Sequence, residues 1–277
     1  MKTIGLILAS VLAGNVAFAQ THNKTKKTTP THSIPKPAGA YYTDTILGVS
    51  VTMVKVEGGN FKMGCIKQHN LDCENDERPS HPVTLKSYYI GQTEVTQALW
   101  RAVMGGANPS AFQRCEDCPV EGISWDEAKD FLEKLNAKSK HVYRLPTEAE
   151  WEFAARGGIQ SKQYKFAGSD DLQKVGWFKD NSMGKTHSVG KKAPNEIGLY
   201  DMSGNVWEWC GDWHSYYSKD TTTVQENPIG PANGRERIYR SGAWNIPMPR
   251  CRTTFRYSRP ANERANSMGL RLVADEK

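Results

Sequence analysis

The spacing of apolar residues predicts a short helix over residues 97–104. Its apolar side chains recur three and four positions apart, as they do on one face of a helix. Thr96 is a suitable N-cap residue, and Gly105 is the type of residue that commonly follows a helix C-terminus. The apolar face consists of Leu99, Trp100 and Val103.

Two further helices are predicted by capping boxes, in which a hydroxyl residue is followed three positions later by glutamate. Ser124 with Glu127 begins a helix that runs to about Lys138. Thr147 with Glu150 begins a shorter helix, and a Gly-Gly pair ends it. All three predicted helices therefore lie in the first 160 residues of the chain.

Strand patterns are short and scattered. Residues 51–64 are typical of a strand, a turn at a Gly-Gly pair and a second strand, and residues 83–90 of one strand. After Arg156 the periodicity fades, with strand-like pieces only at 238–240 and 269–273. The mixture predicts an α+β fold with little regular secondary structure. Local turns, disulfides or bound ions must then hold the chain compact.

The N-terminus has the features of a secretory signal peptide. Lys2 precedes an apolar run from Ile4 to about Val16, and an Ala-x-Ala site predicts cleavage after Ala19. The apolar run is too short to span a bilayer, and a buried N-terminal helix is the alternative. We therefore expect residues 1–19 to be removed. The mature chain should be exported, to the periplasm or the medium, without a transmembrane segment.

The next segment differs from the rest of the chain in charge. Residues 20–40 hold four lysines, three prolines and no acidic residue, which is typical of a flexible basic spacer. The whole chain carries a formal charge of +6, of which Lys2 contributes one unit and the spacer four. Residues 41–277, which have the size of one domain, are thus near +1. Nucleic acid is therefore not an expected partner.

All six cysteines lie in the predicted domain. An even number of cysteines in an exported chain suggests disulfides, with fifteen possible pairings. A zinc site is the alternative, but the Cys-x-x-Cys motif has no second copy to complete four ligands. Proximity favours the pairs Cys65–Cys73 and Cys115–Cys118, and the remainder would form a long-range pair, Cys210–Cys251.

The segment from Gly198 to Trp209 is the most unusual in the chain, with the sequence Gly-Leu-Tyr-Asp-Met-Ser-Gly-Asn-Val-Trp-Glu-Trp. Two tryptophans this close together are expected to be at least partly buried. The carboxylates of Asp201 and Glu208 beside them must then be paired, hydrogen-bonded or metal-bound.

Eight segments in order resemble the formylglycine-generating enzyme (sulfatase-modifying factor) family. Together they span residues 58–272. The resemblance implies that family's variant of the C-type lectin-like fold, an α+β fold with low regular secondary structure, for residues 41–277. The segments are Gly58-Gly-x-Phe-x-Met-Gly64, Glu77-Arg-Pro-x-His-x-Val83, Glu94-Val-Thr96, Pro119-Val-x-x-x-Ser-Trp125, Arg144-Leu-Pro-Thr-Glu-Ala-Glu-Trp-Glu152, the Gly198 to Trp209 block, Arg240-Ser-Gly-Ala-Trp244 and Gly269-Leu-Arg-Leu272.

The resemblance also bears on catalysis. Family members that oxidise a target cysteine bind copper through two cysteines five residues apart, and soft thiolates suit Cu(I). The later cysteine corresponds to Cys251, which is the candidate catalytic residue, and the earlier one falls on Ile246, which offers no donor. We therefore expect neither bound copper nor cysteine oxidation of the known type. The scattered histidines do not suggest the iron site of other relatives.

Calcium is the cofactor that the resemblance implies. Family enzymes bind it through the segment that corresponds to residues 201–208, and hard oxygen donors on a tight turn suit Ca²⁺. The ligands would be the side chains of Asp201 and Glu208 and the backbone carbonyls of Gly204 and Val206. In the alternative interpretation, the two carboxylates pair with arginines or cap turns.

The family's binding groove would here involve Trp207, Trp244 and Arg259, and nearby aromatic residues could hold a peptide or sugar. Nine arginines between positions 235 and 271 could form an anion-binding face. We favour the alternative, in which they pair with acidic residues from the first half of the fold, such as Glu94, Glu148, Glu150 and Glu152.

These observations together predict an exported, calcium-stabilised binding or structural module, whose partner is a protein, peptide or glycan. One alternative is a formylglycine-generating oxidase, or a related oxidoreductase, acting on protein cysteine. The other is a lectin-like ligand-binding protein. The isoleucine at position 246 favours the module over the oxidase.

Overall fold

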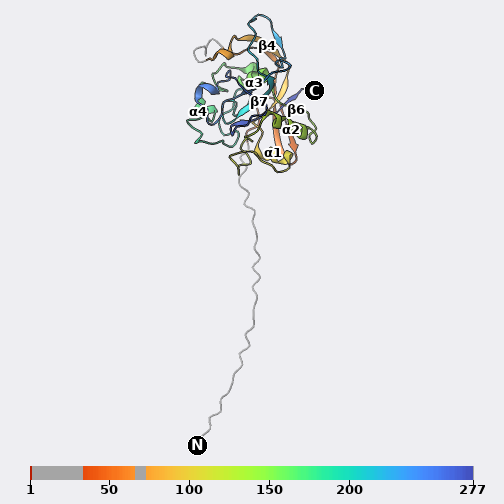
Figure 1. Ribbon diagram of the computed structural model, residues 1–277, viewed down its shortest axis with the longest axis vertical. Coiled ribbons are helices and arrows are strands. Elements are labelled where there is room, and N and C mark those ends of the chain that lie inside the picture. Colours follow the sequence, from red (N-terminus) through yellow and green to blue (C-terminus); the bar gives the residue numbers. More distant parts are fainter. Residues whose placement is uncertain (2–33, 66–72, 277) are drawn as a thin grey trace. The chain divides into compact units, whose positions relative to one another are not determined.

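The computed structural model describes residues 1, 34–65 and 73–276 (Figure 1). The predicted signal peptide and most of the predicted spacer lie outside the described residues. One compact unit covers residues 35–277. Within the part of the chain that the structure describes, none of the helices has the length and apolar character needed to cross a membrane.

The compact unit begins earlier than the sequence predicted. The Pro35 carbonyl accepts a hydrogen bond from Gln92 Nε2 at 2.9 Å, and the Ala40 carbonyl accepts one from the Lys55 backbone at 2.8 Å. Residues 35–40 therefore belong to the domain, which corrects the predicted boundary at 41. Lysine and proline content alone did not reveal these backbone contacts.

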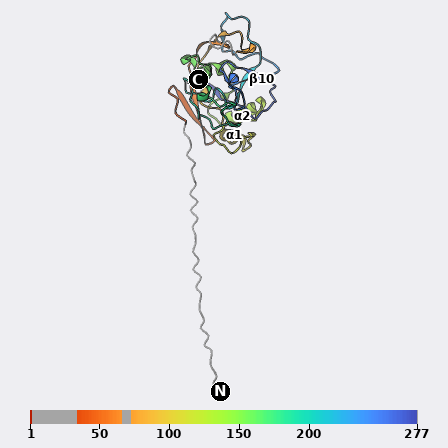
Figure 2. The same ribbon diagram turned by 90° about the vertical axis from the view of Figure 1, so that its left-hand side faces the viewer.

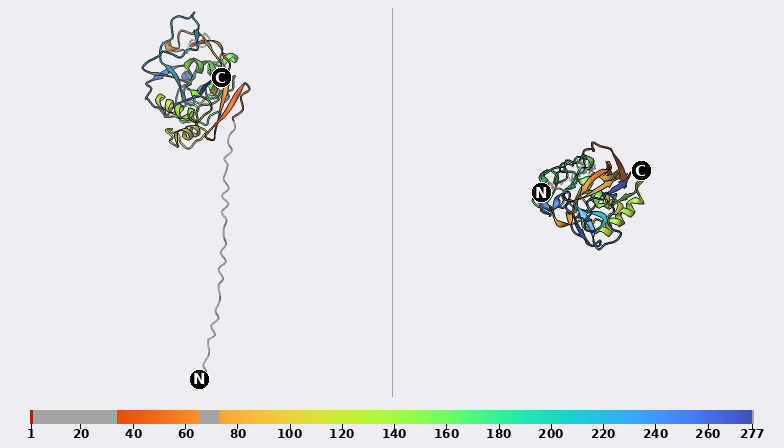
Figure 3. Two further views of the ribbon diagram at one scale, coloured as in Figure 1. Left: turned by 90° about the vertical axis from the view of Figure 1, so that its right-hand side faces the viewer. Right: turned by 90° about the horizontal axis from the view of Figure 1, so that it is seen from above.

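A five-stranded antiparallel sheet joins the two ends of the domain. Its order is β1-β2-β5-β12-β6, so the last strand lies between two strands from the first half. The hairpin β1–β2 forms one edge and is drawn in orange in Figure 3. The strands are β1 (Tyr41–Ile46), β2 (Val49–Val56), β5 (Tyr88–Gly91), β12 (Val273–Asp275) and β6 (Tyr143–Arg144).

Two smaller sheets complete the β structure. The four-stranded sheet has the order β10-β9-β7-β11, and the three-stranded sheet has the order β3-β4-β8. The central strand β7 pairs with β9 antiparallel and with β11 parallel. The strands are β7 (Trp207–Trp213), β9 (Arg237–Arg240), β10 (Tyr257–Arg259), β11 (Met268–Gly269), β3 (Gly59–Met63), β4 (His81–Leu85) and β8 (Gln225–Glu226).

All three predicted helices are present and begin at their predicted caps. Thr96, Ser124 and Thr147 each accept a hydrogen bond from the backbone N–H three residues later. Helices α1 and α2 lie side by side (Figure 2), and their rings Trp100 and Phe131 stack at 4.9 Å. The helices are α1 (Gln97–Met104), α2 (Trp125–Asn136), α3 (Glu148–Ala155) and α4 (Leu172–Val175), with 3-10 turns η2 (Asn75–Glu77), η3 (Gly158–Gln160) and η4 (Met248–Cys251).

The strand predictions were less accurate. The strand, turn and strand predicted over 51–64 are present as β2 and β3, although the two strands enter different sheets, because β2 pairs with β1 and β5 whereas β3 pairs with β4. The single strand predicted over 83–90 is interrupted at Lys86 and Ser87 and forms β4 and β5. Strands β1 and β7 were not predicted at all. The partners of β7 lie far from it in the sequence, so local alternation did not indicate that strand. Strand β1 pairs with the adjacent strand β2, so sequence distance does not explain why it was missed.

Helix α3 lies at the centre of the domain and is buried on every side. Its apolar residues join a core cluster with strands β2, β4 and β5. Its three glutamates are also buried, which requires partners because a buried unpaired charge is costly. The partners determine how the functional residues are arranged.

Candidate functional site

Arginines of the C-terminal third provide partners for two of these three glutamates. Arg256 binds Glu148 through two hydrogen bonds of 2.8 and 2.6 Å, and Arg240 pairs with both Glu148 and Glu152. The ion-pair interpretation of the arginine-rich segment is therefore confirmed for Glu148 and Glu152. It is wrong for Glu150, whose partner is Arg144 at 2.7 Å.

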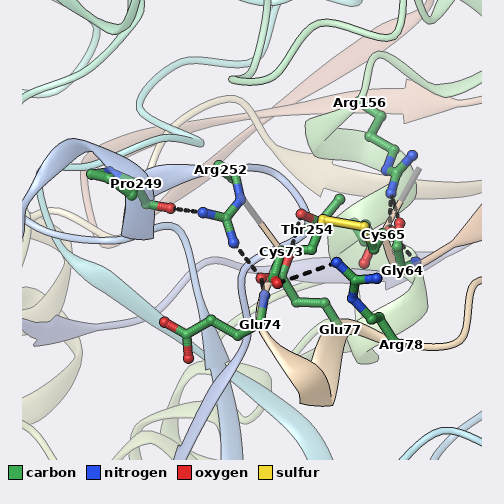
Figure 4. Close-up of a disulfide and its surroundings, with 11 residues drawn as sticks. Gly64, Cys65, Cys73, Glu74, Glu77, Arg78, Arg156, Pro249, Arg252 and Thr254 are labelled. Atoms are coloured by element: carbon green, nitrogen blue, oxygen red, sulfur yellow. Dashed lines mark hydrogen bonds and ion pairs between the residues drawn. A yellow bond between two sulfur atoms is a disulfide. The ribbon is translucent and has the colours of Figure 1, made fainter. Parts of the chain in front are cut away.

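Two of the predicted disulfides are present. Cys65 is bonded to Cys73, and Cys115 to Cys118. Figure 4 shows the first of these beside the buried side chain of Glu77, which accepts hydrogen bonds from Arg252 and Thr254. The disulfide links the end of β3 to the residues just before η2, and the ion pair holds η2 against the C-terminal part of the chain.

The predicted long-range disulfide is absent, which corrects the sequence analysis. Cys210 and Cys251 are both free and buried. Cys210 lies in the central strand β7, and Cys251 ends the turn η4 in a separate apolar cluster. The two thiols belong to different apolar clusters. The even number of cysteines therefore led to a wrong prediction for this pair.

Cys251 does not have the surroundings of a reactive thiol. It is 0% exposed, and burial raises its pKa to about 12. Its sulfur lies so close to Gly242 that a Cβ there would be 2.5 Å from Sγ. Since the thiolate is the nucleophile and metal ligand, this buried thiol is poorly suited to either role.

Ile246 lies beside the same apolar cluster as Cys251 and is half-buried. Its side chain has no atom that could coordinate copper. The donor set of the family's copper site is therefore incomplete at this position, and the residues present do not fit copper.

Glu208, one of the predicted calcium ligands, is occupied by protein donors. Arg271 binds it with Nε at 2.9 Å from Oε2 and Nη2 at 2.6 Å from Oε1. Trp151 Nε1 donates to the same carboxylate at 2.7 Å. This is the alternative that the sequence left open, in which the carboxylate pairs with an arginine.

Asp201 has a different environment. It lies at a turn, with φ of 59°, and its Oδ2 accepts the Gly190 N–H at 2.7 Å, but its Oδ1 is buried without a hydrogen-bond donor. Glu94 is 2% exposed, and neither of its carboxylate oxygens has a donor. Burial raises the pKa of both groups, that of Asp201 to about 6. Repulsion from Asp201 adds to the rise of the Glu94 pKa. The ion-pair prediction for Glu94 was thus wrong.

The two carbonyl ligands of the predicted calcium site lie on the same turn. Gly204 has φ of 123°, and a Cβ at this position would lie 2.2 Å from the Trp177 carbonyl oxygen, so the turn requires glycine. The Gly204 carbonyl accepts a hydrogen bond from Ser241 Oγ at 3.1 Å, and Val206 is buried in the core.

The fit to calcium is consequently partial. The oxygen atoms near the predicted site that could coordinate a metal and have no hydrogen-bond partner are Asp201 Oδ1 and the two carboxylate oxygens of Glu94. Within residues 34–65 and 73–276, no group of three or more His, Cys, Asp or Glu side chains is arranged to hold a metal ion. A cation here would therefore have to take its further ligands from carbonyls and water.

The three predicted groove residues differ in exposure. Trp207 is 5% exposed and packs its ring edge against Tyr239, so it belongs to the core, which corrects its assignment to a groove. Trp244 is half-buried, with Nε1 donating to the Asn266 carbonyl. Arg259 is half-buried and donates to the Tyr239 hydroxyl.

A cavity that the sequence analysis did not identify has a volume of about 750 Å³. It is lined by Trp125, Asp212 and Arg237, among others. Burial, with repulsion from Glu148, raises the pKa of Asp212 to about 7. Arg237 is one of the nine arginines that the sequence analysis considered as an anion-binding face, and it stacks on Trp213.

Comparison with known proteins identifies the family. Residues 48–276 match the family model described as the sulfatase-modifying factor enzyme 1-like domain. The chain belongs to the sulfatase-modifying factor family. This confirms the resemblance and places nearly the whole compact unit within one family domain.

Relatives within the sulfatase-modifying factor family carry different names. The chain is 32% identical to a chaperone protein LppX of Paenibacillus barcinonensis, over 81% of this chain and 90% of that one. It is 27% identical to a formylglycine-generating enzyme of Streptomyces coelicolor, over 80% and 88% of the two chains. Since the names differ, membership alone does not specify the activity.

Solved structures confirm the fold. The Treponema denticola variable protein 1 matches with a TM-score of 0.77 and 31% identity, over 86% of this chain and 99% of that one. The predicted α+β fold of the sulfatase-modifying factor type is therefore correct.

Proposed function

We propose that this sulfatase-modifying factor domain is an exported binding or structural module that lacks copper-dependent cysteine oxidation. One observation carries the proposal. The position of the family's first copper thiolate is Ile246, and the remaining thiol, Cys251, is completely buried with a raised pKa.

Both requirements of a thiolate copper site are missing. Copper(I) in such a site needs two soft donors, and a hydrocarbon side chain supplies none. The single thiol would also have to lose its proton while surrounded by apolar side chains, which burial opposes. This chain aligns with 90% of the length of a relative that is named as a chaperone. That similarity supports a non-catalytic role for this type of domain.

The test is a direct assay of both properties. The mature protein is incubated with Cu(I), oxygen and a peptide that contains the Cys-x-Pro-x-Arg motif, and the peptide is read by mass spectrometry. Binding of Cu(I) is measured in parallel by competition with a chromogenic chelator. A family enzyme that oxidises cysteine serves as the positive control. We expect no formylglycine and no tight Cu(I) binding; conversion of the peptide would overturn the proposal.

We propose further that calcium stabilises the module at Asp201, with Glu94 as an additional acidic ligand. Support comes from the three buried oxygens of these two carboxylates that have no donor. Arg271 cannot neutralise them by direct contact, because its nitrogens bind Glu208 and the carbonyls of Gly91 and Tyr200. A divalent cation bound there would offset the buried negative charge and rigidify the turn.

Thermal unfolding tests the calcium proposal. The midpoint of unfolding should rise when calcium is added after chelation, and the variant Glu94→Gln should lose most of that rise. Glu263→Gln, which alters an exposed acid paired with Arg259, is the matched control. The same midpoint with calcium and with chelator would contradict the proposal.

A further inference from the structure

The cavity of about 750 Å³ is assembled from distant parts of the chain. Its walls come from the turn between β4 and β5, the start of α2, the start of α3, the ends of β7 and β9 and the C-terminal strand β12. Its size is that of a small-molecule site. Neither Cys251 nor Ile246 is among the lining residues, so the cavity is separate from the family's copper position.

One lining residue, Arg237, is held in an unusual way. Its guanidinium lies between the rings of Trp125 and Trp213, with Cζ 3.7 Å and 3.4 Å from the two ring centroids. The stacking fixes the plane of the guanidinium and covers both of its faces. Only its nitrogen-bearing edge can then contact a ligand.

Much of that edge is unused. Nη1 donates to the Gly211 carbonyl at 2.6 Å, whereas Nε is buried without an acceptor. Among the described residues, no carboxylate lies within ion-pair distance of Arg237. The fully buried arginines of the C-terminal segment, such as Arg240 and Arg271, have a glutamate in contact, whereas Arg237 is half-buried. Arg237 therefore departs from the pattern that the rest of the segment follows.

In the described part of the chain, none of the other charged groups that line the cavity forms an ion pair with Arg237. Three of the four lining acids already have cationic partners, because Arg144 binds Glu150 and Asp275, and Lys55 binds Glu276. Two lining lysines, Lys86 and Lys129, are exposed and have no ion pair among the described residues.

The fourth acid, Asp212, lies at the cavity wall and accepts the Glu148 N–H at 2.8 Å. Burial raises its pKa to about 7. Near neutral pH a substantial part of this carboxyl group is protonated. In that form it has a proton that it can donate to an anion, and it does not repel the anion.

We propose that this cavity binds a small ligand through a carboxylate group, which the edge of the Arg237 guanidinium receives. The planar fork of arginine matches a carboxylate better than a tetrahedral anion or a neutral amide does. Lys86 and Lys129 add positive charge at the wall. This inference rests on the binding function proposed above and gives it a ligand class.

Titration with simple probes tests the inference. Succinate is the probe, succinamide is its neutral counterpart, and sulfate is a tetrahedral anion. Tryptophan fluorescence reports binding because Trp125 and Trp213 flank Arg237, and the Nε–H signal of Arg237 in an NMR spectrum gives a second readout. Succinate should produce a saturable change in both signals, succinamide none and sulfate a weaker one.

Variants locate the site. Arg237→Lys keeps the charge but loses the fork, and it should weaken succinate binding about tenfold or more. Arg235→Lys makes the same change at an exposed arginine two positions away and should leave binding unchanged. Should Arg237→Lys prove unstable, Lys129→Gln replaces it, because this exposed side chain can be changed without disturbing the core; it should weaken binding several-fold.

Three outcomes would overturn the carboxylate site: no saturable response to succinate, equal responses in Arg237→Lys and the wild type, or equal affinity for sulfate. None of these would affect the absence of copper chemistry. Conversely, conversion of the cysteine peptide would overturn the proposed function and leave the succinate result intact. The two failures are therefore distinguishable.

Discussion

Glu208 and Arg271 form a bidentate ion pair in the interior of the domain, with both side chains at 0% exposure. Glu208 lies on the central strand β7, and Arg271 lies between β11 and β12. The pair thus joins the C-terminal segment to the strand around which the second sheet is built. The Glu208 carboxylate, which the sequence analysis considered as a calcium ligand, is bound by Arg271 in this structure.

Removal of one partner of this pair should be strongly destabilising. The variant Glu208→Leu would leave Arg271 buried without its anion, and the free energy of unfolding should fall by about 3–5 kcal/mol. Urea denaturation measures the loss. Arg264→Ala, which breaks an exposed pair with Glu127, is the comparison and should cost less than about 1 kcal/mol. Similar losses in both variants would contradict a special role for the buried pair.

The two free cysteines should be inaccessible in the folded protein. Iodoacetamide should label neither Cys210 nor Cys251 in the native state, because both are buried and burial raises the pKa of both thiols. Labelling in denaturant without reductant should modify these two residues alone, which peptide mass spectrometry would show. Native labelling of Cys251 would indicate an accessible thiol and would weaken the case against a catalytic role.

The pKa of Asp212 makes stability depend on pH. Burial and the charge of Glu148 raise it from 3.8 to about 7, so the folded state holds this proton more tightly than the unfolded state. The stabilisation is complete below about pH 4 and is lost as the pH rises to about 7. Asp212→Asn should therefore stabilise the protein at pH 8, on the order of 1–4 kcal/mol, and change little at pH 4.

Denaturation at the two pH values checks this prediction. The asparagine retains an oxygen that can accept the Glu148 N–H, as Asp212 Oδ2 does now. Asp126→Asn alters an exposed acid on α2 and serves as the control. The same difference between Asp212→Asn and the wild type at both pH values would refute the raised pKa.

The cap of α2 provides a prediction that rests on local structure. Ser124 Oγ accepts the Glu127 N–H at 3.2 Å, and the Glu127 carboxylate accepts the Ser124 N–H at 2.9 Å. Ser124→Ala should lower the free energy of unfolding by about 1 kcal/mol, and Ser124→Asp should lower it less. Urea denaturation of the two variants tests the order, and an alanine variant as stable as the wild type would rule out the cap.

Local elements of this protein were predictable because their causes are local. The helix that begins after Thr147 depends on contacts within four residues, and it starts where the capping box indicated. The disulfide between Cys115 and Cys118 closes a separation of three residues. The eight family segments likewise identified the fold, because each is recognisable by itself.

The candidate site was less predictable. The pattern indicated that arginines of the last third pair with acids of the first half, as Arg256 does with Glu148. It could not indicate that Glu94 would lack an arginine or that Arg237 would lie between two tryptophans. Such partners depend on how several segments pack together in the folded protein. The spacing of residues along the chain carries little information about that packing.

The sequence by itself determined the starts of three helices, the two short-range disulfides and the family. Tertiary structure alone decided that Cys210 and Cys251 remain apart, that Trp207 lies in the core and that Glu208 binds Arg271. The physical reason is the range of the interactions. Caps and turns satisfy the backbone within a few residues, whereas burial and charge pairing depend on segments that only folding brings together.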